Sequence, residues 1–314
     1  MKILVTGGCG FIGSHLVDRL IALGHEVQDL DYLTYAGDAV NTIRDKKTYI
    51  HIYKKVQDAK LRHVFDPIDV IYHLAAESAV DKSNLDPNGF TETNVVGTFN
   101  MLMLAKALKV KKFIQISTDE VLGHLKPNDP PFMVNSPIMP RNIYSATKAA
   151  GEHIARAFVN VYDLPVIIVR SCNAYGPHQQ VEKFIPRAIT KVLSGQKIPL
   201  YGTGENIREW IYVTDLVAGL TDLLNIDATG QTVHFSSSEE KTNKEIAETI
   251  ANELNGEIEH VADRKAHDER YALTPTDEFK TKTKFEDGLL DTINWYKNNL
   301  DWWKRSIQKC SAAW

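Results

Sequence analysis

The chain has 314 residues, of which 43% are hydrophobic and 24% are charged, a composition typical of a globular protein of one large or two modest domains. Its formal net charge of -4 argues against a nucleic-acid partner, which would require a basic face. No apolar run approaches the roughly 20 residues that cross a bilayer, so no membrane partner is expected.

The cysteines Cys9, Cys172 and Cys310 are odd in number, and their spacing matches no zinc pattern, so no metal site is expected. Few cysteines favour a reducing compartment. An apolar strand begins directly after Met1, which leaves no room for a signal peptide. We therefore expect a cytoplasmic protein.

A glycine-rich turn near the start of the chain separates a strand from a helix. Residues 2–6 form a short apolar run, and residues 14–23 have helical spacing. Between them lie Gly7, Gly10 and Gly13. In this context glycines let the backbone approach a pyrophosphate, whose charge meets the N-terminus of the helix. The segment predicts dinucleotide binding.

A second expected strand, residues 26–31, ends in an acid. Asp31 lies 18 residues after Gly13, close to the spacing of about 20 residues at which a carboxylate binds the adenosine ribose. This charge would repel a 2'-phosphate, so NAD is predicted in preference to NADP. Asp29 shares the same strand face and is the alternative, but Asp31 is nearer the carboxyl end.

Further apolar segments alternate with helical ones, which predicts an α/β fold with a Rossmann-type, doubly wound parallel sheet. The expected strands are 49–53, 69–74, 113–117 and 165–170, and the expected helices are 93–108 and 144–162. Later segments are shorter and mixed, with helices expected at 184–194, 215–224 and 243–254 and strands at 198–201 and 207–213. We expect an NAD-binding domain over 1–172 and a smaller mixed α/β substrate-binding portion over 173–314, some of which returns to the first domain.

Two acids, Asp119 and Glu120, follow a hydroxyl, Thr118, where the strand 113–117 ends. The carboxyl ends of strands border the ligand crevice in such sheets. Two acids there can divide the work, one donating a proton and the other removing one. Taken alone, the run is more typical of a polar turn after a strand.

Tyr144 and Lys148 are four residues apart and project from one face of a helix. An ammonium beside a phenol lowers the pKa of the phenol, which would prepare Tyr144 to act as a base. The alternative is the ordinary start of an amphipathic helix.

Together, Gly7, Gly10, Gly13, Thr118, Tyr144, Lys148 and Asn173 resemble the pattern of extended short-chain dehydrogenases/reductases. Within this family the chain is similar to nucleotide-sugar 4,6-dehydratases over residues 33–37, 75–78, 117–121, 182–186, 208–213 and 263–271. The paired acids at 119 and 120 are the most specific feature, because epimerases of the same fold usually lack the pair. The resemblance implies an NAD-dependent hydro-lyase that dehydrates a nucleotide-sugar substrate, with dTDP-glucose as the first choice.

The resemblance also implies roles for individual residues. The implied catalytic set is Thr118, Asp119, Glu120, Tyr144 and Lys148. Cofactor contacts are implied for Gly7, Gly10, Phe11, Ile12, Gly13, Asp31, Leu33, Thr34, Asp58, Leu74, Ala75, Ala76, Thr93, Tyr144, Lys148 and Ala174. Substrate contacts are implied for Ser78, Thr118, Asn173, Glu182, Lys183, Pro199, Tyr201, Arg208, Arg264 and His267. A homodimer is implied, with the helices that carry Thr93 and Tyr144 at its interface.

The chain departs from the family pattern at several positions. The nucleobase and the hexose of the substrate are therefore not determined by the resemblance. The region around Lys55 and Asp58 stands where the family usually has an acid that binds adenine, and Ala79, Leu122 and Ala174 replace the usual residues. UDP-glucose or another nucleotide-hexose is therefore an alternative substrate. A 4-epimerase or decarboxylase on the same scaffold would share the glycine turn, Tyr144 and Lys148 but would not need both acids. A non-catalytic binding protein is a further alternative, since fold alone does not decide function, although it would be expected to have lost one of these residues.

Overall fold

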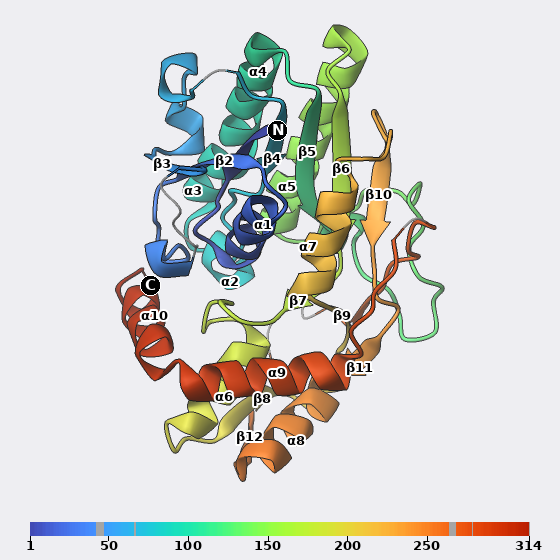
Figure 1. The fold of residues 1–314 in the computed structure, drawn as a ribbon. Coiled ribbons are helices and arrows are strands. Elements are labelled where there is room, and N and C mark those ends of the chain that lie inside the picture. Colours follow the sequence, from blue (N-terminus) through green and yellow to red (C-terminus); the bar gives the residue numbers. More distant parts are fainter. Residues whose placement is uncertain (42–46, 66, 264–267, 278, 314) are drawn as a thin grey trace.

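The structure is a computed structural model that describes residues 1–41, 47–65, 67–263, 268–277 and 279–313. A sheet of seven strands forms its larger part, and all neighbouring pairs are parallel (Figure 1). The order is β10-β6-β5-β4-β1-β2-β3. The strands are β1 (Lys2–Thr6), β2 (Glu26–Asp31), β3 (Tyr49–Tyr53), β4 (Val70–His73), β5 (Lys112–Thr118), β6 (Val166–Ser171) and β10 (Thr232–Phe235). The strand order switches between β1 and β4: strands that follow β1 in sequence first lie on one side of it (β2, β3) and later on the other (β4, β5, β6). Sheets of this kind bind ligands at such a switch point.

Helices cover both faces of this sheet, which explains the continuous apolar runs of its strands. Helices α1 (Phe11–Ala22) and α7 (Val213–Asp222) lie in front of the sheet in Figure 1, and α4 (Thr98–Leu108) and α5 (Ile143–Tyr162) lie behind it. Ile3 and Val5 pack with the first pair, whereas Leu4 between them packs with the second. The doubly wound fold predicted from the alternation of strands and helices is confirmed.

The helix expected over 93–108 is longer and interrupted. It begins as α3 (Pro87–Thr91), passes through a π-helical turn, η4 (Glu92–Gly97), and continues as α4. The start is earlier than expected because Asp86 caps the helix by accepting from Gly89 N at 3.0 Å and Pro87 occupies its first position. Within the π turn, Asn94 is buried and bonds both backbone groups of Glu77.

A smaller part of the molecule lies below the carboxyl edge of the sheet (Figure 1). Strand β9 (Ile207–Tyr212) pairs there with β7 (Asn173–Tyr175), β11 (Glu240–Thr242) and β13 (Arg270–Tyr271), and β8 (Ile198–Tyr201) pairs with β12 (Ile258–Val261). Its helices are α6 (Phe184–Leu193), α8 (Asn243–Leu254), α9 (Phe285–Asn298) and α10 (Leu300–Ala313). The short α2 (Val80–Ser83) follows β4. Between β9 and β11 the chain returns to the large sheet as α7 and β10, the latter a strand that apolar spacing did not single out.

The last helix ties the C-terminal part back to the loop after β2. Trp302 Nε1 donates to Asn41 Oδ1 at 2.7 Å, and Lys309 Nζ donates to Gly37 O at 3.0 Å. Trp303 is buried, and its indole N–H donates to Tyr296 O at 3.0 Å. The two adjacent tryptophans, Trp302 and Trp303, are therefore core residues.

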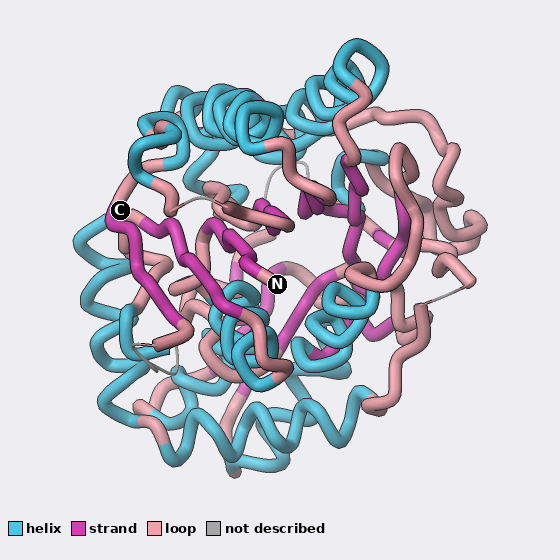
Figure 2. The backbone as a smooth tube through the Cα atoms, turned by 45° about the horizontal axis from the view of Figure 1, so that its top comes forward, coloured by secondary structure: helices cyan, strands magenta, loops and turns pink. Residues whose placement is uncertain are grey.

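Figure 2 shows the strands gathered in the middle of the molecule with helices around them.

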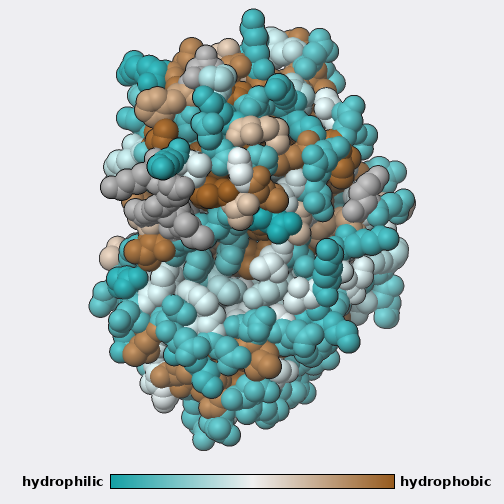
Figure 3. Space-filling view, in the orientation of Figure 1, coloured by the Kyte–Doolittle hydropathy of each residue, from teal (hydrophilic) through white to brown (hydrophobic). Residues whose placement is uncertain are grey.

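The face drawn in Figure 3 is dominated by hydrophilic side chains with hydrophobic ones scattered among them. None of the described helices is long and apolar enough to cross a membrane.

Candidate active site

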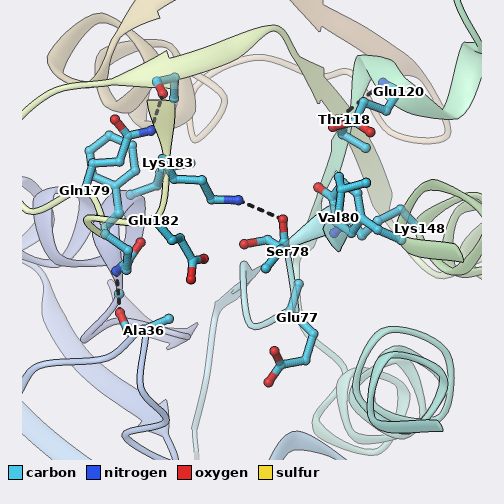
Figure 4. Close-up of a pocket in the computed structure, with 18 of the residues that line it drawn as sticks. Ala36, Glu77, Ser78, Val80, Thr118, Glu120, Lys148, Gln179, Glu182 and Lys183 are labelled. Atoms are coloured by element: carbon cyan, nitrogen blue, oxygen red, sulfur yellow. Dashed lines mark hydrogen bonds between the residues drawn. The ribbon is translucent and has the colours of Figure 1, made fainter. Parts of the chain in front are cut away.

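A cavity of about 1110 Å³ lies along the carboxyl edge of the large sheet and extends to the smaller part of the molecule. Its walls come from segments far apart in the sequence, from the glycine turn after β1 to Tyr271 in β13. Figure 4 shows Thr118, Glu120 and Lys148 on one side of the cavity and Glu182 and Lys183 across from them. The position matches the ligand crevice expected for a doubly wound sheet.

The glycine turn forms one wall of this cavity and has no room for side chains. Gly7 has a φ of 75°, a conformation that favours glycine. A Cβ on Gly7 would lie 2.9 Å from Ala75 N, and one on Gly13 would lie 2.0 Å from Gly7 O. α1 begins directly after Gly10, so its N-terminus faces the same wall. This backbone cradle fits the pyrophosphate of a dinucleotide.

Asp31 lies at the end of β2 and lines the cavity, whereas Asp29 does not. The carboxylate of Asp31 accepts hydrogen bonds from Leu33 N at 2.7 Å and Cys9 N at 3.0 Å. Burial and the neighbouring Asp29 raise the pKa of Asp31 to about 6, and the two backbone donors act in the opposite direction. Of the two aspartates in this strand, Asp31 is the one that a ribose in the cavity could reach.

Most of the other residues expected at the cofactor also line the cavity. They are Phe11, Ile12, Thr34, Leu74, Ala75, Ala76, Thr93, Tyr144, Lys148 and Ala174. Leu33 and Asp58 are not among the lining residues. Asp58 is exposed at the end of a short 3-10 turn, η2 (Val56–Asp58), and Lys55 and Gln57 border the cavity there instead. The structure does not bring the Asp58 carboxylate to the expected adenine position.

The two acids after β5 stand in different surroundings. They lie in a 3-10 turn, η5 (Asp119–Leu122), which places successive side chains in different directions. Glu120 lines the cavity, and its carboxylate accepts from Asn142 Nδ2 at 3.1 Å. Asp119 is buried behind this wall and accepts from Thr118 Oγ1 at 3.0 Å. Its Oδ2 has no hydrogen-bond partner among the described residues.

These surroundings affect both pKa values. Burial and the charge of Glu120 raise the pKa of Asp119 to about 8. Burial also raises the pKa of Glu120, while Asn142, Lys183 and Arg208 favour its ionised form. Asp119 therefore retains a proton at neutral pH, and Glu120 is the acid whose charge the surroundings support.

Tyr144 and Lys148 lie on the first turns of α5 and both line the cavity. Lys148 Nζ donates to Ile116 O at 2.6 Å, and burial lowers the pKa of Lys148 to about 8. Burial and the charges of Glu120 and Asp119 raise the pKa of Tyr144 above its ordinary value, and a hydrogen bond with Thr118 acts against them. The expected lowering of this pKa by Lys148 is therefore not found in this structure, in which burial and the two acids raise it.

Most of the residues expected at the substrate also line the cavity, on both of its sides. Ser78, Thr118, Asn173, Glu182, Lys183, Pro199, Tyr201 and Arg208 all line it. Lys183 Nζ donates to Ser78 O at 2.8 Å, a contact drawn in Figure 4. Arg208 donates through Nη2 to Asp268 O at 3.0 Å, and its guanidinium lies 4.5 Å from the centre of the Tyr271 ring. Arg264 and His267 lie outside the described residues.

Two residues that line the cavity, Asn142 and Tyr271, and one that bonds a lining residue, Tyr35, were missed by sequence reasoning. Asn142 caps α5 by accepting from Ser145 N at 2.8 Å while it bonds Glu120. Tyr35 donates to Glu182 Oε1 at 3.1 Å, and Tyr271 lines the cavity. An asparagine just before an expected helix is a capping signal that could have identified Asn142. Tyr35 and Tyr271 gave no such signal, because their contacts depend on segments distant in sequence.

Residues 3–236 match a family described as the NAD dependent epimerase/dehydratase family. The chain belongs to this family. It is 39% identical over 318 residues to the dTDP-glucose 4,6-dehydratase of Mycobacterium tuberculosis, covering 97% of this chain and 96% of that one. It is 40% identical over 310 residues to the low-salt glycan biosynthesis protein Agl12 of Haloferax volcanii, covering 94% of this chain and 98% of that one.

Solved structures of a dehydratase and of an epimerase superpose closely on this chain. The crystal structure of DesIV, a dTDP-glucose 4,6-dehydratase from Streptomyces venezuelae with NAD bound, superposes with a TM-score of 0.94 at 38% identity, covering 98% of this chain and all of the other (100%). A UDP-glucose 4-epimerase from Thermus thermophilus in complex with NAD gives a TM-score of 0.86 at 28% identity, over 95% of this chain and 100% of that one.

Proposed function

We propose that this protein is an NAD-dependent nucleotide-sugar 4,6-dehydratase that converts dTDP-glucose to dTDP-4-keto-6-deoxyglucose. The observation that carries the proposal is the pair Asp119 and Glu120 beside Thr118, Tyr144 and Lys148, at a cavity that also contains the glycine turn. Its two acids have different hydrogen-bond partners, as a reaction that needs both an acid and a base requires. The similarity to dTDP-glucose 4,6-dehydratases over nearly the whole chain supports the same activity.

The residues around the glycine turn fit NAD. Gly7, Gly10 and Gly13 would hold the pyrophosphate, and Asp31 would accept hydrogen bonds from the adenosine ribose. When bound, NAD supplies the acceptor for the hydride of the sugar C4 and the donor that returns it to C6. Because the cycle ends with the cofactor in its starting state, it needs no added oxidant or reductant.

In the first step, Tyr144 takes the proton of the sugar C4 hydroxyl while that carbon is oxidised. Thr118 holds the oxygen, and Lys148 stabilises the phenolate form of Tyr144, which accepts this proton and becomes a phenol. The pKa of Tyr144 is raised in this structure, so the phenol needs further positive charge nearby before it acts as a base. Lys148 lies one helical turn away on the same face of α5 and is the chain's own source of that charge.

The ketone at C4 makes the C5 hydrogen acidic, and Glu120 removes it. The hydroxyl on C6 then leaves as water with a proton from Asp119. Thr118 lies between Asp119 and the cavity, so this proton passes through the Thr118 hydroxyl or follows a rotation of the Asp119 side chain. The hydride returns to C6 and a proton returns to C5 from Glu120. The proton that Tyr144 took from the C4 hydroxyl then restores Asp119, with Thr118 in contact with both side chains, so the sugar loses one water and every group regains its starting state.

Two other activities fit the same scaffold. A UDP-glucose 4,6-dehydratase would use the same catalytic residues but different contacts to the nucleobase of the substrate. A 4-epimerase would use Tyr144 and Lys148 but has no need for both acids. The second of these is less favoured, because the buried Asp119 and the cavity-facing Glu120 have a use only in an elimination.

Mass spectrometry of the product tests the proposal. Purified protein is incubated separately with dTDP-glucose and UDP-glucose, without added reductant. We expect a product lighter by one water, formed faster from dTDP-glucose. An isomer of unchanged mass would make the protein an epimerase, and a preference for UDP-glucose would change the assigned nucleotide.

We also infer a homodimer formed by the helices η4–α4 and α5. Val96, Phe99 and Met103 recur at helical spacing and are 48%, 48% and 42% exposed. Val161 and Tyr162, at the end of α5, are exposed as well. An apolar helical face of this kind is typical of an interface, and a second copy of the chain would cover it. Sedimentation should give a dimer mass, and Phe99→Glu should shift it to the monomer; a monomer for the unaltered protein would contradict this.

A cytoplasmic location is part of the same proposal. Cys9, Cys172 and Cys310 are all free thiols, which suits a reducing compartment. Fractionation of the source cells should find the protein with cytoplasmic enzymes, and recovery in a secreted fraction would contradict this.

A further inference from the structure

We propose that Cys9, Asp29 and His51 form a site for one thiophilic divalent cation, of which Zn²⁺ fits best. The three ligand atoms are Sγ, Oδ2 and Nδ1. The Sγ–Oδ2 separation is 3.2 Å, the Oδ2–Nδ1 separation is 3.1 Å and the Sγ–Nδ1 separation is 3.9 Å. Zinc binds sulfur at about 2.3 Å and nitrogen or oxygen at about 2.0–2.2 Å, so tetrahedral ligands lie about 3.3–3.6 Å apart. The cluster is close to that geometry without rearrangement of the backbone.

Three adjacent strands bring these residues together. Cys9 follows β1, Asp29 belongs to β2 and His51 belongs to β3. Asp29 and His51 are direct partners in the parallel pairing of β2 and β3. None of the three lines the cavity of the candidate active site. The site lies behind the glycine turn and is separate from the residues proposed to bind the sugar nucleotide.

The charges of the cluster favour a cation. Cys9 and Asp29 are fully buried, and Asp31 is a second buried carboxylate next to them. Without a metal, the thiol proton of Cys9 is directed at Asp29 Oδ2, which lies 3.2 Å from Sγ. A bound divalent ion replaces that proton: the S–H bond breaks, the proton leaves to solvent and an S–metal bond forms. The ion then offsets the negative charges of Cys9 and Asp29.

Neighbouring groups already hold the ligands in place. Asp29 Oδ1 accepts from Gly8 N at 2.8 Å, and the hydroxyl of Tyr49 donates to Asp29 Oδ2 at 2.9 Å. Such outer contacts orient ligands in metal sites. The side chain of His51 is 26% exposed, so this ligand is the one nearest the surface, and water would be the fourth ligand of the proposed ion. The Gly8 contact links the site to the turn proposed to hold NAD.

Cobalt titration of the NAD-loaded enzyme, freed of metal with a chelator, tests this inference. We expect one Co²⁺ per chain with the intense visible bands of tetrahedral coordination, a near-ultraviolet band from thiolate to metal, and release of a proton. Zn²⁺ should displace the cobalt. Cys9→Ser should remove the thiolate band. His51→Ala should weaken metal binding by more than about tenfold, because loss of a residue that only supports a ligand already lowers metal affinity by about tenfold or more.

Cys310→Ser is the matched control, because it removes another buried thiol. It should leave the spectrum and the stoichiometry unchanged. If Cys9→Ser fails to fold, His51→Ala decides, since His51 is only half-buried. Absence of tetrahedral bands, or binding that neither variant changes, would show a hydrogen-bonded network with no metal function. Because the readouts are binding and spectra, a negative result here leaves the proposed dehydratase activity untouched.

Discussion

Two strands of the same sheet end in paired acids, and the pairs are held in different ways. At the end of β2, Asp29 accepts four hydrogen bonds, from Gly8 N, Cys9 Sγ, Tyr49 and His51. At the end of β5, Asp119 accepts one, from Thr118, and its second oxygen is buried without a partner among the described residues.

The difference follows from where the chain turns. Asp29 and Asp31 alternate along a strand and share one face, so the glycine turn can satisfy both with backbone N–H groups. Asp119 and Glu120 are consecutive in a 3-10 turn and point to different environments. The hydrogen bonds of Asp29 and Asp31, both in β2, hold the glycine turn in place, whereas Asp119, after β5, keeps an oxygen that no described residue bonds and that can take part in proton transfer. This contrast predicts different consequences for substitutions in the two pairs.

The largest effect is expected for Glu120→Gln. It removes the proposed base and should lower the rate of dehydration by about 10²–10⁴-fold, the usual contribution of general base catalysis. Oxidation at C4 should persist, visible as bound NADH absorbance on adding dTDP-glucose. Glu248→Gln on exposed α8 is the control. A Glu120→Gln enzyme that still releases water at the normal rate would exclude the role.

Asp119→Asn should slow loss of the C6 hydroxyl by about 10²–10⁴-fold, again as expected for proton transfer. The pH profile gives the sharper test. Asp119 is an acid only while protonated, so its contribution is present below its pKa of about 8 and is lost as the pH rises through that value. The unaltered enzyme should show this alkaline limb and the variant should lack it; the same limb in both would assign it to another group.

Asp31→Asn should affect the cofactor rather than the chemistry. Loss of a charged acceptor costs about 1.5–3 kcal/mol, so the purified variant should contain less NAD. The pKa of Asp31 is about 6, and the carboxylate is the form that binds, so NAD retention in the unaltered protein should fall as the pH drops through that value. Fluorescence titration measures both effects. Equal retention by the two proteins across this range would contradict the assignment.

The smallest effect is expected at Asn142, which joins the catalytic pair to α5. Asn142→Ala should lower the free energy of unfolding by about 1 kcal/mol through loss of the helix cap. Asn142→Ser should restore the cap but not the bond to Glu120. We therefore expect thermal unfolding to recover in the serine variant while kcat stays reduced severalfold. Full recovery of kcat with serine would reduce Asn142 to a structural role.

Sequence reasoning predicted the local features of the dinucleotide half well. The glycine turn, the strand ending in Asp31 and the Tyr144–Lys148 pair depend on short-range spacing, and the structure places them along one cavity. The strand β10 was not singled out, because its pairing with β6 joins residues far apart in the sequence. Interaction over distance also explains why the raised pKa of Tyr144 was not anticipated, since burial is a tertiary property.

The cluster of Cys9, Asp29 and His51 is a second feature that local sequence patterns did not predict. The cysteine spacing gave no reason to expect a metal, because the ligands are of three types and belong to neighbouring strands. Only the register of β2 and β3 brings Asp29 next to His51. A search for cysteine patterns alone does not detect such a site.

The fate of the hydride at C4 is the most direct test of the central claim. dTDP-glucose labelled with deuterium at C4 is converted by the enzyme with its own bound NAD, and the product is analysed by mass spectrometry and NMR. We expect a 4-keto product that has lost one water and carries the deuterium at C6. Deuterium retained at C4 in a product of unchanged mass would contradict dehydration, and loss of the label would contradict return of the stored hydride.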